Sequence, residues 1–345
     1  MTTNYIGADV DSRTTNLAVE RNGRIVQELC VPTTIPALRA ALESIRRPRE
    51  LTLEEGPMAS WLARGLKDSV DRLVVCDPYH NGLISRDGDA DDLIDARKLA
   101  TLLRGNFLRE VYHSDDPQRV LLKQWVGIYQ DRVRDGVRQV NKIRARCLQH
   151  GLWPPRGALR NPGRREAWLK DLGAHPAVEQ LQVLFIGFDA AAQQVELSRR
   201  QIVRRSRPYK IIGFWQALPG VGPIRAITLF AYLDTPWRFD FNRHKLWKYC
   251  GVGIERSSSG KDRNGRPKVG FLQLAWRVNR QLKSAVMGAA FSAIQQGGNP
   301  FAAQHERLVH EGVSTGNARH TVARKMLYVM WGMWKNESAF DPQRV

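Results

Sequence analysis

The first hundred residues alternate between short strand-like segments and amphipathic helical segments. Three strands are expected first, at residues 4–9, 14–20 and 23–30, with a tight turn at Asn22-Gly23. Helices and strands then alternate, at residues 34–47, 49–55, 58–69 and 72–77, before an acidic helix near 90–104. This order predicts a mixed α/β sheet with helices packed against it.

The rest of the chain is predicted to be mainly helical. A long helix with a basic face covers about 118–151, and a Pro/Gly-rich break at 153–165 separates it from a second helix that ends near Arg205. Together they predict an antiparallel, coiled-coil-like arm. The last third contains a Pro-Gly-Val-Gly-Pro turn, a Gly/Ser-rich loop and further helices. We therefore divide the chain into residues 1–110, 111–205 and 206–345.

Positive charge is strong and unevenly distributed. The chain carries a net charge of +19. Residues 1–100 hold 13 basic and 16 acidic residues, whereas residues 201–280 hold 16 and 4. This asymmetry favours a polyanionic partner, most simply nucleic acid. Expected phosphate contacts are the basic face of the long helix and the glycine turn, which resembles a helix-hairpin-helix element: Arg138, Lys142, Arg146, Gly220 and Gly222.

Several classes of protein are disfavoured. No apolar run approaches the ~20 residues of a membrane span, and the first residues lack the regions of a signal peptide. The four cysteines are scattered without a C-x-x-C pair, which argues against structural zinc and a disulfide framework. We expect a bacterial cytoplasmic protein that associates with the nucleoid and makes no membrane contact.

Four acids are expected to meet at one sheet edge. Asp9 ends the first strand, Glu54 ends the fourth, and Asp92 and Asp95 share one face of the acidic helix. If the two strands are adjacent and parallel, their ends emerge together and the helix can cover them. Carboxylates so placed would bind Mg²⁺ or Mn²⁺, and two such ions commonly serve phosphoryl transfer.

Alternatives remain at this cluster. Acids near a helix start also cap free N–H groups and suit the helix dipole, which needs no metal. Asp11 shares strand parity with Asp9, and Asp91 lies on much the same helix face as Asp95. Glu55 is adjacent to Glu54 but points to the opposite face of an extended strand.

Several segments together resemble the insertion-sequence-110 family of transposases, relatives of the Piv/MooV DNA invertases. The segments are IGAD, LEEG, DDLIDARKLA, LPGVGPIRA, KLWKYCGVGIERSSSGKDRNGRPKVG and HTVARKMLYVMWGMWKNESAFDP. The resemblance covers both ends of the chain and leaves a divergent middle. It implies a RuvC-like, RNase H-fold N-terminal domain with a D-E-D-D set at Asp9, Glu54, Asp92 and Asp95. The family spacing Asp-x-x-Asp-Ala favours Asp92 over Asp91, although family members often place Lys-Thr or Lys-Ser where Ala90-Asp91 stands.

The resemblance also implies a second catalytic element. Family members are similar in carrying a serine before a glycine that attacks DNA to form a covalent phosphoserine, and Ser259 matches that position, with Ser258 in reserve. The surrounding basic residues would hold the phosphate: Arg256, Lys261, Arg263, Arg266 and Lys268. Further implications are a structured non-coding guide RNA (the bridge RNA), donor and target double-stranded DNA, and a dimer or tetramer. Where the family has Glu-x-[Thr/Ser]-Gly, this chain has Glu54-Glu55-Gly56-Pro57, so Glu55 remains an alternative.

The resulting hypothesis is a transposase or site-specific recombinase that cuts and rejoins DNA through a serine–DNA intermediate. One alternative is a metal-dependent nuclease or junction resolvase that uses water as the nucleophile. An actin-like or sugar-kinase ATPase is weaker, because Asp11 stands where the phosphate loop of that class needs glycine. A non-catalytic DNA-binding protein built on the glycine turn is the remaining alternative.

Overall fold

The chain divides into two compact units, residues 1–115 and 116–345. The computed structural model describes residues 2–84, 92–240, 242–257, 271–274 and 278–344. The boundary predicted near residue 205 falls inside the second unit, at the C-terminal end of a long helix that ends at Ser206.

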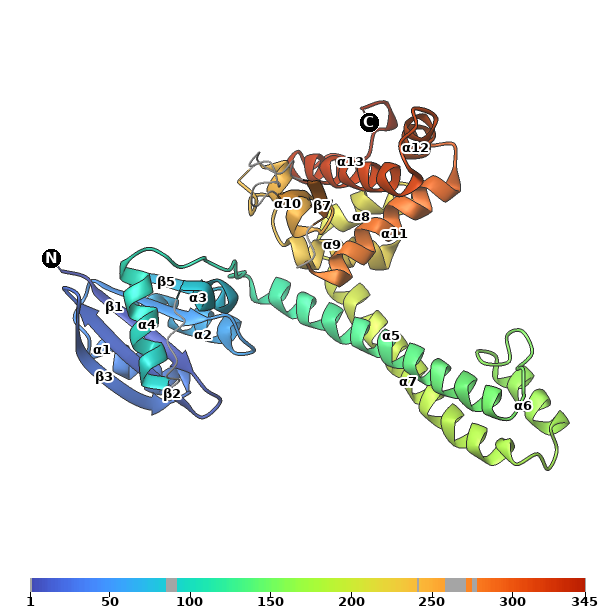
Figure 1. The fold of residues 1–345 in the computed structure, drawn as a ribbon, viewed down its shortest axis with the longest axis horizontal. Coiled ribbons are helices and arrows are strands. Elements are labelled where there is room, and N and C mark those ends of the chain that lie inside the picture. Colours follow the sequence, from blue (N-terminus) through green and yellow to red (C-terminus); the bar gives the residue numbers. More distant parts are fainter. Residues whose placement is uncertain (1, 85–91, 241, 258–270, 275–277, 345) are drawn as a thin grey trace, which may run out of the picture. The chain divides into compact units, whose positions relative to one another are not determined.

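A five-stranded sheet forms the centre of the N-terminal unit (Figure 1). Its strands are β1 (Asn4–Val10), β2 (Thr14–Arg21), β3 (Arg24–Pro32), β4 (Arg49–Glu54) and β5 (Arg72–Cys76). Their order across the sheet is β3-β2-β1-β4-β5. Strand β2 runs antiparallel to β1 and β3, whereas β1, β4 and β5 are parallel. The predicted strands are therefore confirmed, and the structure meets the condition that the first and fourth strands are adjacent and parallel.

Helices cover both faces of this sheet. They are α1 (Ile35–Glu43), α2 (Ala59–Leu66), α3 (Pro78–Ile84) and α4 (Asp92–Arg104). On one face, alternate residues of β1 and β4 such as Ile6, Ala8 and Leu51 pack with α1 and α2 in one core. On the other face, Val74 and Cys76 of β5 pack against leucines of α4. The period-two alternation of buried side chains thus assigns each strand residue to one helical layer.

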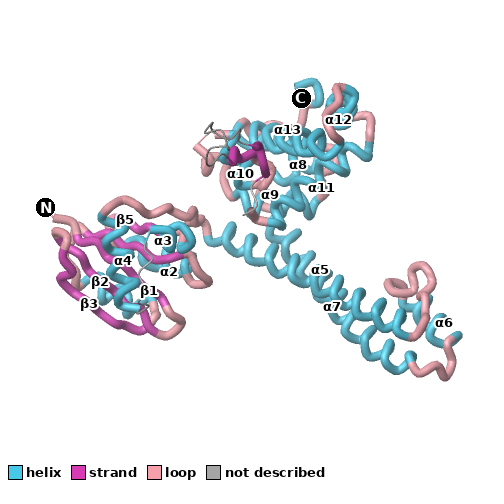
Figure 2. The backbone as a smooth tube through the Cα atoms, viewed as in Figure 1, coloured by secondary structure: helices cyan, strands magenta, loops and turns pink. Residues whose placement is uncertain are grey.

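Two long helices pack along each other at the start of the second unit, α5 (Pro117–Gln149) and α7 (Ala177–Ser206) (Figure 2). The predicted antiparallel pair is confirmed. Between them lies α6 (Pro162–Asp171), which begins inside the predicted break at 153–165 and continues beyond it, so the second predicted helical stretch consists of two helices, α6 and α7. Helix α6 starts there because the side chain of Asn161 caps the helix and Pro162 occupies a first-turn position, where proline is tolerated.

The remaining part of the second unit is mostly helical, as predicted. Its helices are α8 (Lys210–Gln216), α9 (Pro223–Leu233), α10 (Arg243–Tyr249), α11 (Arg280–Gln296), α12 (Pro300–His310) and α13 (Thr315–Lys335). Their core contains Trp215, Phe230 and Trp334, whose rings stack edge-on or tilted against one another. No helix among the described residues is long and apolar enough to cross a membrane.

A two-stranded antiparallel sheet differs from the prediction of a plain loop at 251–270. Its strands are β6 (Ile254–Ser257) and β7 (Phe271–Leu274). The pairing involves only four residues on each side, and it joins segments that are separated by the glycine- and serine-rich tract. Such a short alternation does not stand out in a sequence, because the turn residues beside it dominate the local pattern.

Candidate active site

Asp9 and Glu54 lie at the same end of two neighbouring parallel strands. The last registered pair between β1 and β4 is Ala8 with Leu53, so Asp9 and Glu54 are the next residues along each strand. Because Ala8 and Leu53 face the core under α1 and α2, the following residues face the layer that α4 covers. The structure thus places both carboxylates at one sheet edge and on one face.

Helix α4 approaches this face at unusually short range. A Cβ atom on Gly7 would lie 2.0 Å from the backbone oxygen of Ala96 and 2.5 Å from the backbone nitrogen of Ala100. Only glycine therefore fits at this point of β1, and the small side chains of Ala96 and Ala100 allow the helix backbone to reach it. The signal in the sequence was a glycine inside a strand, which often marks a close backbone approach.

Polar clamps fix the rotation of α4 on the sheet. Glu20 of β2 is only 2% exposed, and it accepts hydrogen bonds from Thr101 Oγ1 at 2.7 Å and from Arg104 Nε. Nearer the helix start, Glu28 of β3 accepts two hydrogen bonds from the guanidinium of Arg97. Together with the glycine contact, these clamps hold the acidic first turn of α4 near the carboxyl ends of β1 and β4.

The four predicted acids interact electrostatically. Burial is the main cause that raises the pKa of Asp9 from its ordinary 3.8 to about 6. The negative charges of Asp92, Asp95 and Glu54 raise it further, in that order. Lys98 supplies a positive charge beside these four acids, with its Nζ 3.4 Å from Asp95 Oδ1. The edge therefore carries an excess of negative charge.

The acids share an edge without forming a closed metal site. Among the described residues, no group of three or more His, Cys, Asp or Glu side chains is placed to hold a metal ion. The electrostatic interaction of the acids is compatible with this absence of a closed site, because charges interact over distances well beyond the ~2.0–2.1 Å of a bond to Mg²⁺. The donor set fits, since carboxylate oxygens at high negative charge density suit a hard divalent cation. Metal binding by these four residues stays a prediction.

Two of the alternative acids are engaged elsewhere. The Asp11 carboxylate accepts from the backbone N–H of Arg13 at 3.3 Å and from the Ser12 hydroxyl at 3.4 Å. Backbone hydrogen bonds from Ser12 and Arg13 lower the pKa of Asp11. Glu55 lies 2.6 Å from His113 Nε2. These contacts favour Asp9 and Glu54, whereas Asp91 lies outside the described residues.

Asn81 of α3 is a buried neighbour of Glu54 that the sequence did not reveal. It is 4% exposed, and its Nδ2 donates to Glu54 Oε1 at 2.9 Å and to Cys76 Sγ at 3.1 Å. This bond holds one carboxylate oxygen of Glu54 in place and leaves the other free of that contact. A single asparagine in a short helix carries no pattern that could have identified it.

The serine tract lies almost entirely outside the described residues. That holds for Ser258, Ser259 and four of the predicted basic contacts, Lys261, Arg263, Arg266 and Lys268. Arg256 belongs to β6, and Ser257 pairs in register with Phe271 of β7. The described hairpin thus brings the two ends of the tract together, and the roles of its residues stay predictions.

The glycine turn between α8 and α9 packs against α11. Gly220 has φ of +77°, and a Cβ atom there would lie 2.2 Å from the backbone oxygen of Ala289. Its N–H already donates to Gln296 Oε1 at 3.0 Å, so this group is not free for a phosphate. A tight helix–helix connection explains Gly220. Gly222, by contrast, is exposed at the start of α9.

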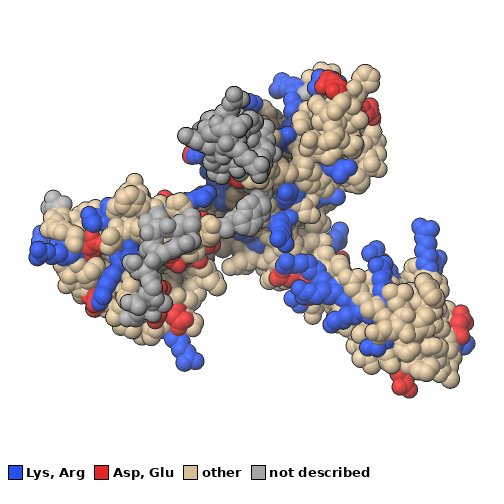
Figure 3. Space-filling model, viewed as in Figure 1, with Lys and Arg blue, Asp and Glu red and all other residues tan. Residues whose placement is uncertain are grey.

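The basic residues predicted on α5 are exposed (Figure 3). Arg138 pairs with Asp135 at 2.6 Å, which offsets part of its charge. Lys142 has no carboxylate partner among the described residues, and Arg146 contacts only the neutral side chain of Gln149 at 2.7 Å. Lys142 and Arg146 are therefore the better phosphate contacts of the three.

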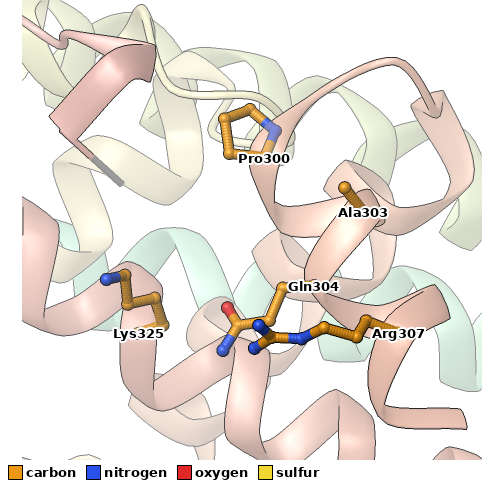
Figure 4. A pocket seen from close by; sticks show the side chains of 5 residues that line it. All are labelled: Pro300, Ala303, Gln304, Arg307 and Lys325. Carbon is orange, nitrogen blue, oxygen red and sulfur yellow. The ribbon is translucent and has the colours of Figure 1, made fainter.

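A hollow of about 360 Å³ lies between α12 and α13. It is lined by Pro300, Ala303, Gln304, Arg307 and Lys325, and Figure 4 shows Gln304 and Arg307 projecting from α12. Arg307 forms a long ion pair of 3.7 Å with Glu311. Two of the five residues that line the hollow, Arg307 and Lys325, are basic.

Residues 215–306 match the model of the transposase family IS116/IS110/IS902. The chain carries an IS110-family transposase domain. The match begins in α8 and ends in α12, so it includes the glycine turn and the β6–β7 hairpin. It confirms the resemblance predicted from the sequence, and transposases are enzymes that cut and rejoin DNA. No protein of curated function matches the chain.

We expect Gly7→Ala to disrupt the docking of α4. The added methyl group would meet backbone atoms of α4 that cannot move independently, and overpacking of this kind costs about 1–3 kcal/mol or more. Denaturant unfolding of the N-terminal unit should therefore begin at lower concentration. Gly56→Ala is the matched control, because a Cβ atom there meets nothing within 4 Å. Equal unfolding midpoints for Gly7→Ala and wild type would contradict this role of Gly7.

We also expect Asp9 to make stability depend on pH. Between its ordinary pKa of 3.8 and about 6, the folded state binds more protons than the unfolded state. The free energy of unfolding therefore falls as pH rises through this window. In metal-free buffer, Asp9→Asn should raise Tm at pH 8 by a few degrees and leave it nearly unchanged near pH 3.5.

Asp11→Asn provides the control of opposite sign. Because hydrogen bonds lower the pKa of Asp11, its charged form stabilises the fold, and removal of the charge should not raise Tm at pH 8. A Tm difference between Asp9→Asn and wild type that is the same at both pH values would refute the assigned shift.

Proposed function

We propose that the protein is the transposase of an insertion sequence, acting as a site-specific DNA recombinase with two catalytic elements. One is the acidic edge of the N-terminal unit, formed by Asp9, Glu54, Asp92 and Asp95. The other is Ser259 in the transposase domain. The observation that carries the proposal is the meeting of the four acids at one edge, where burial first, and then the charges of Asp92, Asp95 and Glu54, raise the pKa of Asp9 to about 6. Strongly perturbed pKa values of this kind cluster at functional sites.

The strand order supports a RuvC-like, RNase H-fold interpretation of the N-terminal unit. Strand β1 is central, with the antiparallel hairpin partner β2 on one side and the parallel β4 on the other. The parallel pairing of β1 with β4 brings the first two acids of the D-E-D-D set to one edge of the sheet. Helix α4 then supplies the other two from the covering layer.

The acidic residues would hold Mg²⁺ or Mn²⁺, which when bound stabilises charge on the attacking and leaving oxygens of a phosphodiester. The contribution of the chain is to position these carboxylates. Asp9 must lose its proton, Asn81 keeps one oxygen of Glu54 fixed, and the clamps on α4 hold the acidic turn in reach. A cation bound nearby would lower the raised pKa of Asp9, because added positive charge favours the ionised form of the carboxyl group.

For the serine step, the Ser259 oxygen would attack phosphorus and form a phosphoserine bond. The bond from phosphorus to one deoxyribose oxygen breaks, and the serine proton is balanced by the proton that the leaving hydroxyl gains. The energy of the phosphodiester is retained in the new bond, so rejoining needs no nucleotide cofactor. Basic residues beside the serine would stabilise the developing charge.

Donor and target double-stranded DNA and a structured guide RNA are the proposed polyanionic partners. The net charge of +19 and the exposed Lys142 and Arg146 on α5 support nucleic-acid binding in general. A homodimer or homotetramer is supported by a stripe of exposed apolar residues on α7. Val183, Ile186 and Leu197 are 69%, 71% and 61% exposed, which an isolated helical arm does not explain.

A metal-dependent nuclease or junction resolvase is the alternative. The acids alone could activate water, and the serine tract belongs to a different compact unit. The two functions predict different products: a recombinase leaves a protein–DNA adduct and rejoined strands, whereas a nuclease leaves free ends.

Adjacent residue pairs allow a sharp test of the recombinase. With Mg²⁺, guide RNA and DNA, wild type should give an adduct that resists denaturant. Glu54→Gln should abolish strand cleavage and the adduct, because it removes one acid of the edge. Glu55→Gln should retain activity, since that side chain contacts His113 instead. Gel analysis of labelled DNA under denaturing conditions measures both products.

The serine pair completes the same experiment. Ser259→Ala should lose the adduct and all strand exchange while it still binds DNA and RNA, and Ser258→Ala should retain both activities. Strand exchange by Ser259→Ala at the wild-type rate would exclude this serine. Accumulation of free hydrolysed ends, with no adduct in wild type, would support the nuclease.

We expect the basic face of α5 to contribute to the salt dependence of nucleic-acid binding. In Lys142→Gln/Arg146→Gln, the log–log salt slope of duplex binding should fall by up to ~0.9 for each phosphate that the variant no longer neutralises. Fluorescence anisotropy with a labelled duplex at several salt concentrations measures the slope. The control Arg199→Gln/Arg200→Gln removes two α7 arginines that already pair with Glu196. If both double variants change the slope equally, the α5 face has no particular role.

A further inference from the structure

A second basic hollow lies at the opposite end of the N-terminal sheet from the acidic edge. It encloses about 200 Å³ and is lined by Thr2, Asn4, Arg21, Arg46 and Arg47. This volume is many times the ~10–15 Å³ that admits one water molecule. Three of its five lining residues are arginines, and none is acidic.

A buried asparagine organises the hollow. Asn4 is 2% exposed at the start of β1, and its Nδ2 donates to the backbone oxygen of Arg46 at 2.6 Å. Its Oδ1 accepts from Arg21 Nε at 2.7 Å. This bond uses Nε of Arg21, and within the described part of the chain the two terminal nitrogens of that guanidinium have no hydrogen-bond acceptor. Arg21 is thus held in place with its fork free to bind an anion.

Positive charge in the hollow is incompletely neutralised. Arg47 pairs with Asp71 at 2.7 Å, but Arg21 and Arg46 have no carboxylate partner among the described residues. Beneath them, Arg49 donates to the backbone oxygens of Ser69 and Ile45. Burial and the nearby charge of Arg47 lower the pKa of Arg49, and Asp71 and Glu43 oppose this shift. Such a group of guanidinium groups is stabilised when an anion enters it.

We propose that this hollow, formed by Arg21, Arg46 and Arg47 around Asn4, binds a phosphate group of a nucleic-acid backbone. The proposal rests on the proposed function for the identity of the polymer, because the same chemistry would also bind a free phosphate compound. Arginine forks match phosphate oxygens in pairs, which makes phosphate a better ligand than a monovalent halide.

The sheet sets the distance of this contact from the acidic edge. Asn4 and Asp9 are both in β1, and five residues of strand span about 17 Å at ~3.3–3.4 Å each. The bound phosphate would therefore be distinct from the one that is cut. At ~3.4 Å per nucleotide along one strand, it lies about five nucleotides away, where it would fix the register of the polymer over the acids.

The test compares Arg46→Gln with Arg24→Gln in the full-length protein. Both arginines are exposed, lie in the same unit and have no carboxylate partner among the described residues, but only Arg46 lines the hollow. Arg46 contacts Asn4 through its backbone oxygen alone, so the substitution keeps that hydrogen bond. Arg21→Gln is a second variant that removes the oriented fork itself.

Two measurements are made in EDTA, so that neither depends on metal chemistry. Inorganic phosphate at constant ionic strength, with chloride as reference, should raise the Tm of wild type and Arg24→Gln but not of Arg46→Gln or Arg21→Gln. Duplex binding by Arg46→Gln should weaken several-fold at low salt, with a log–log slope smaller by ~0.9. Arg24→Gln should change this slope less.

Four other outcomes of these experiments would change the proposal or overturn it. Loss of the phosphate effect with unchanged duplex binding would keep the phosphate site and assign it to a free phosphate compound. Equal behaviour of Arg24→Gln and Arg46→Gln would overturn the site. A change of oligomeric state in Arg46→Gln, without an effect on phosphate or duplex binding, would assign the hollow to a protein carboxylate. Absence of strand cleavage by wild type would refute the proposed function and leave phosphate binding intact.

Discussion

The contact between Gly7 of β1 and the backbone of α4 is the constraint on which the candidate active site depends. A helix that packs on a sheet through ordinary side chains stands about 10 Å away, whereas here Ala96 and Ala100 approach a bare strand backbone. That proximity brings the acidic first turn of α4 within electrostatic reach of Asp9. The ion pairs of Glu20 and Glu28 then prevent the helix from rotating its acids away.

The repulsion that results has to be balanced by the rest of the unit. Burial and three nearby negative charges raise the pKa of Asp9, so part of the folding free energy holds groups together that would otherwise separate. The apolar core under α1 and α2 lies on the other face of the same strands and provides that stability. If the proposed metal ions bind at this edge, their binding would be linked to the ionisation of Asp9.

The charges of the N-terminal unit are segregated along one strand. Carboxylates gather at the end of β1, where Asp9 lies, and incompletely neutralised arginines gather at its start, around Asn4. A rigid strand keeps the two groups about 17 Å apart. In the proposed function, a nucleic acid held at the basic end would present a different phosphate at the acidic end, and the sheet would set the distance between the two contacts.

Periodicity in the sequence was sufficient for the order of strands and helices along the N-terminal unit and for the antiparallel α5–α7 pair, because local alternation reveals both. The expectation that Asp9, Glu54, Asp92 and Asp95 share an edge also needed β1 to lie beside β4, which the sequence analysis assumed and only the sheet topology decided. Tertiary structure decided which of Glu54 and Glu55 faces α4, the burial of Gly220 against α11, and the roles of Asn81 and Asn4. Those outcomes depend on contacts between residues far apart in the chain, and no local pattern records the partner that a single polar side chain will meet.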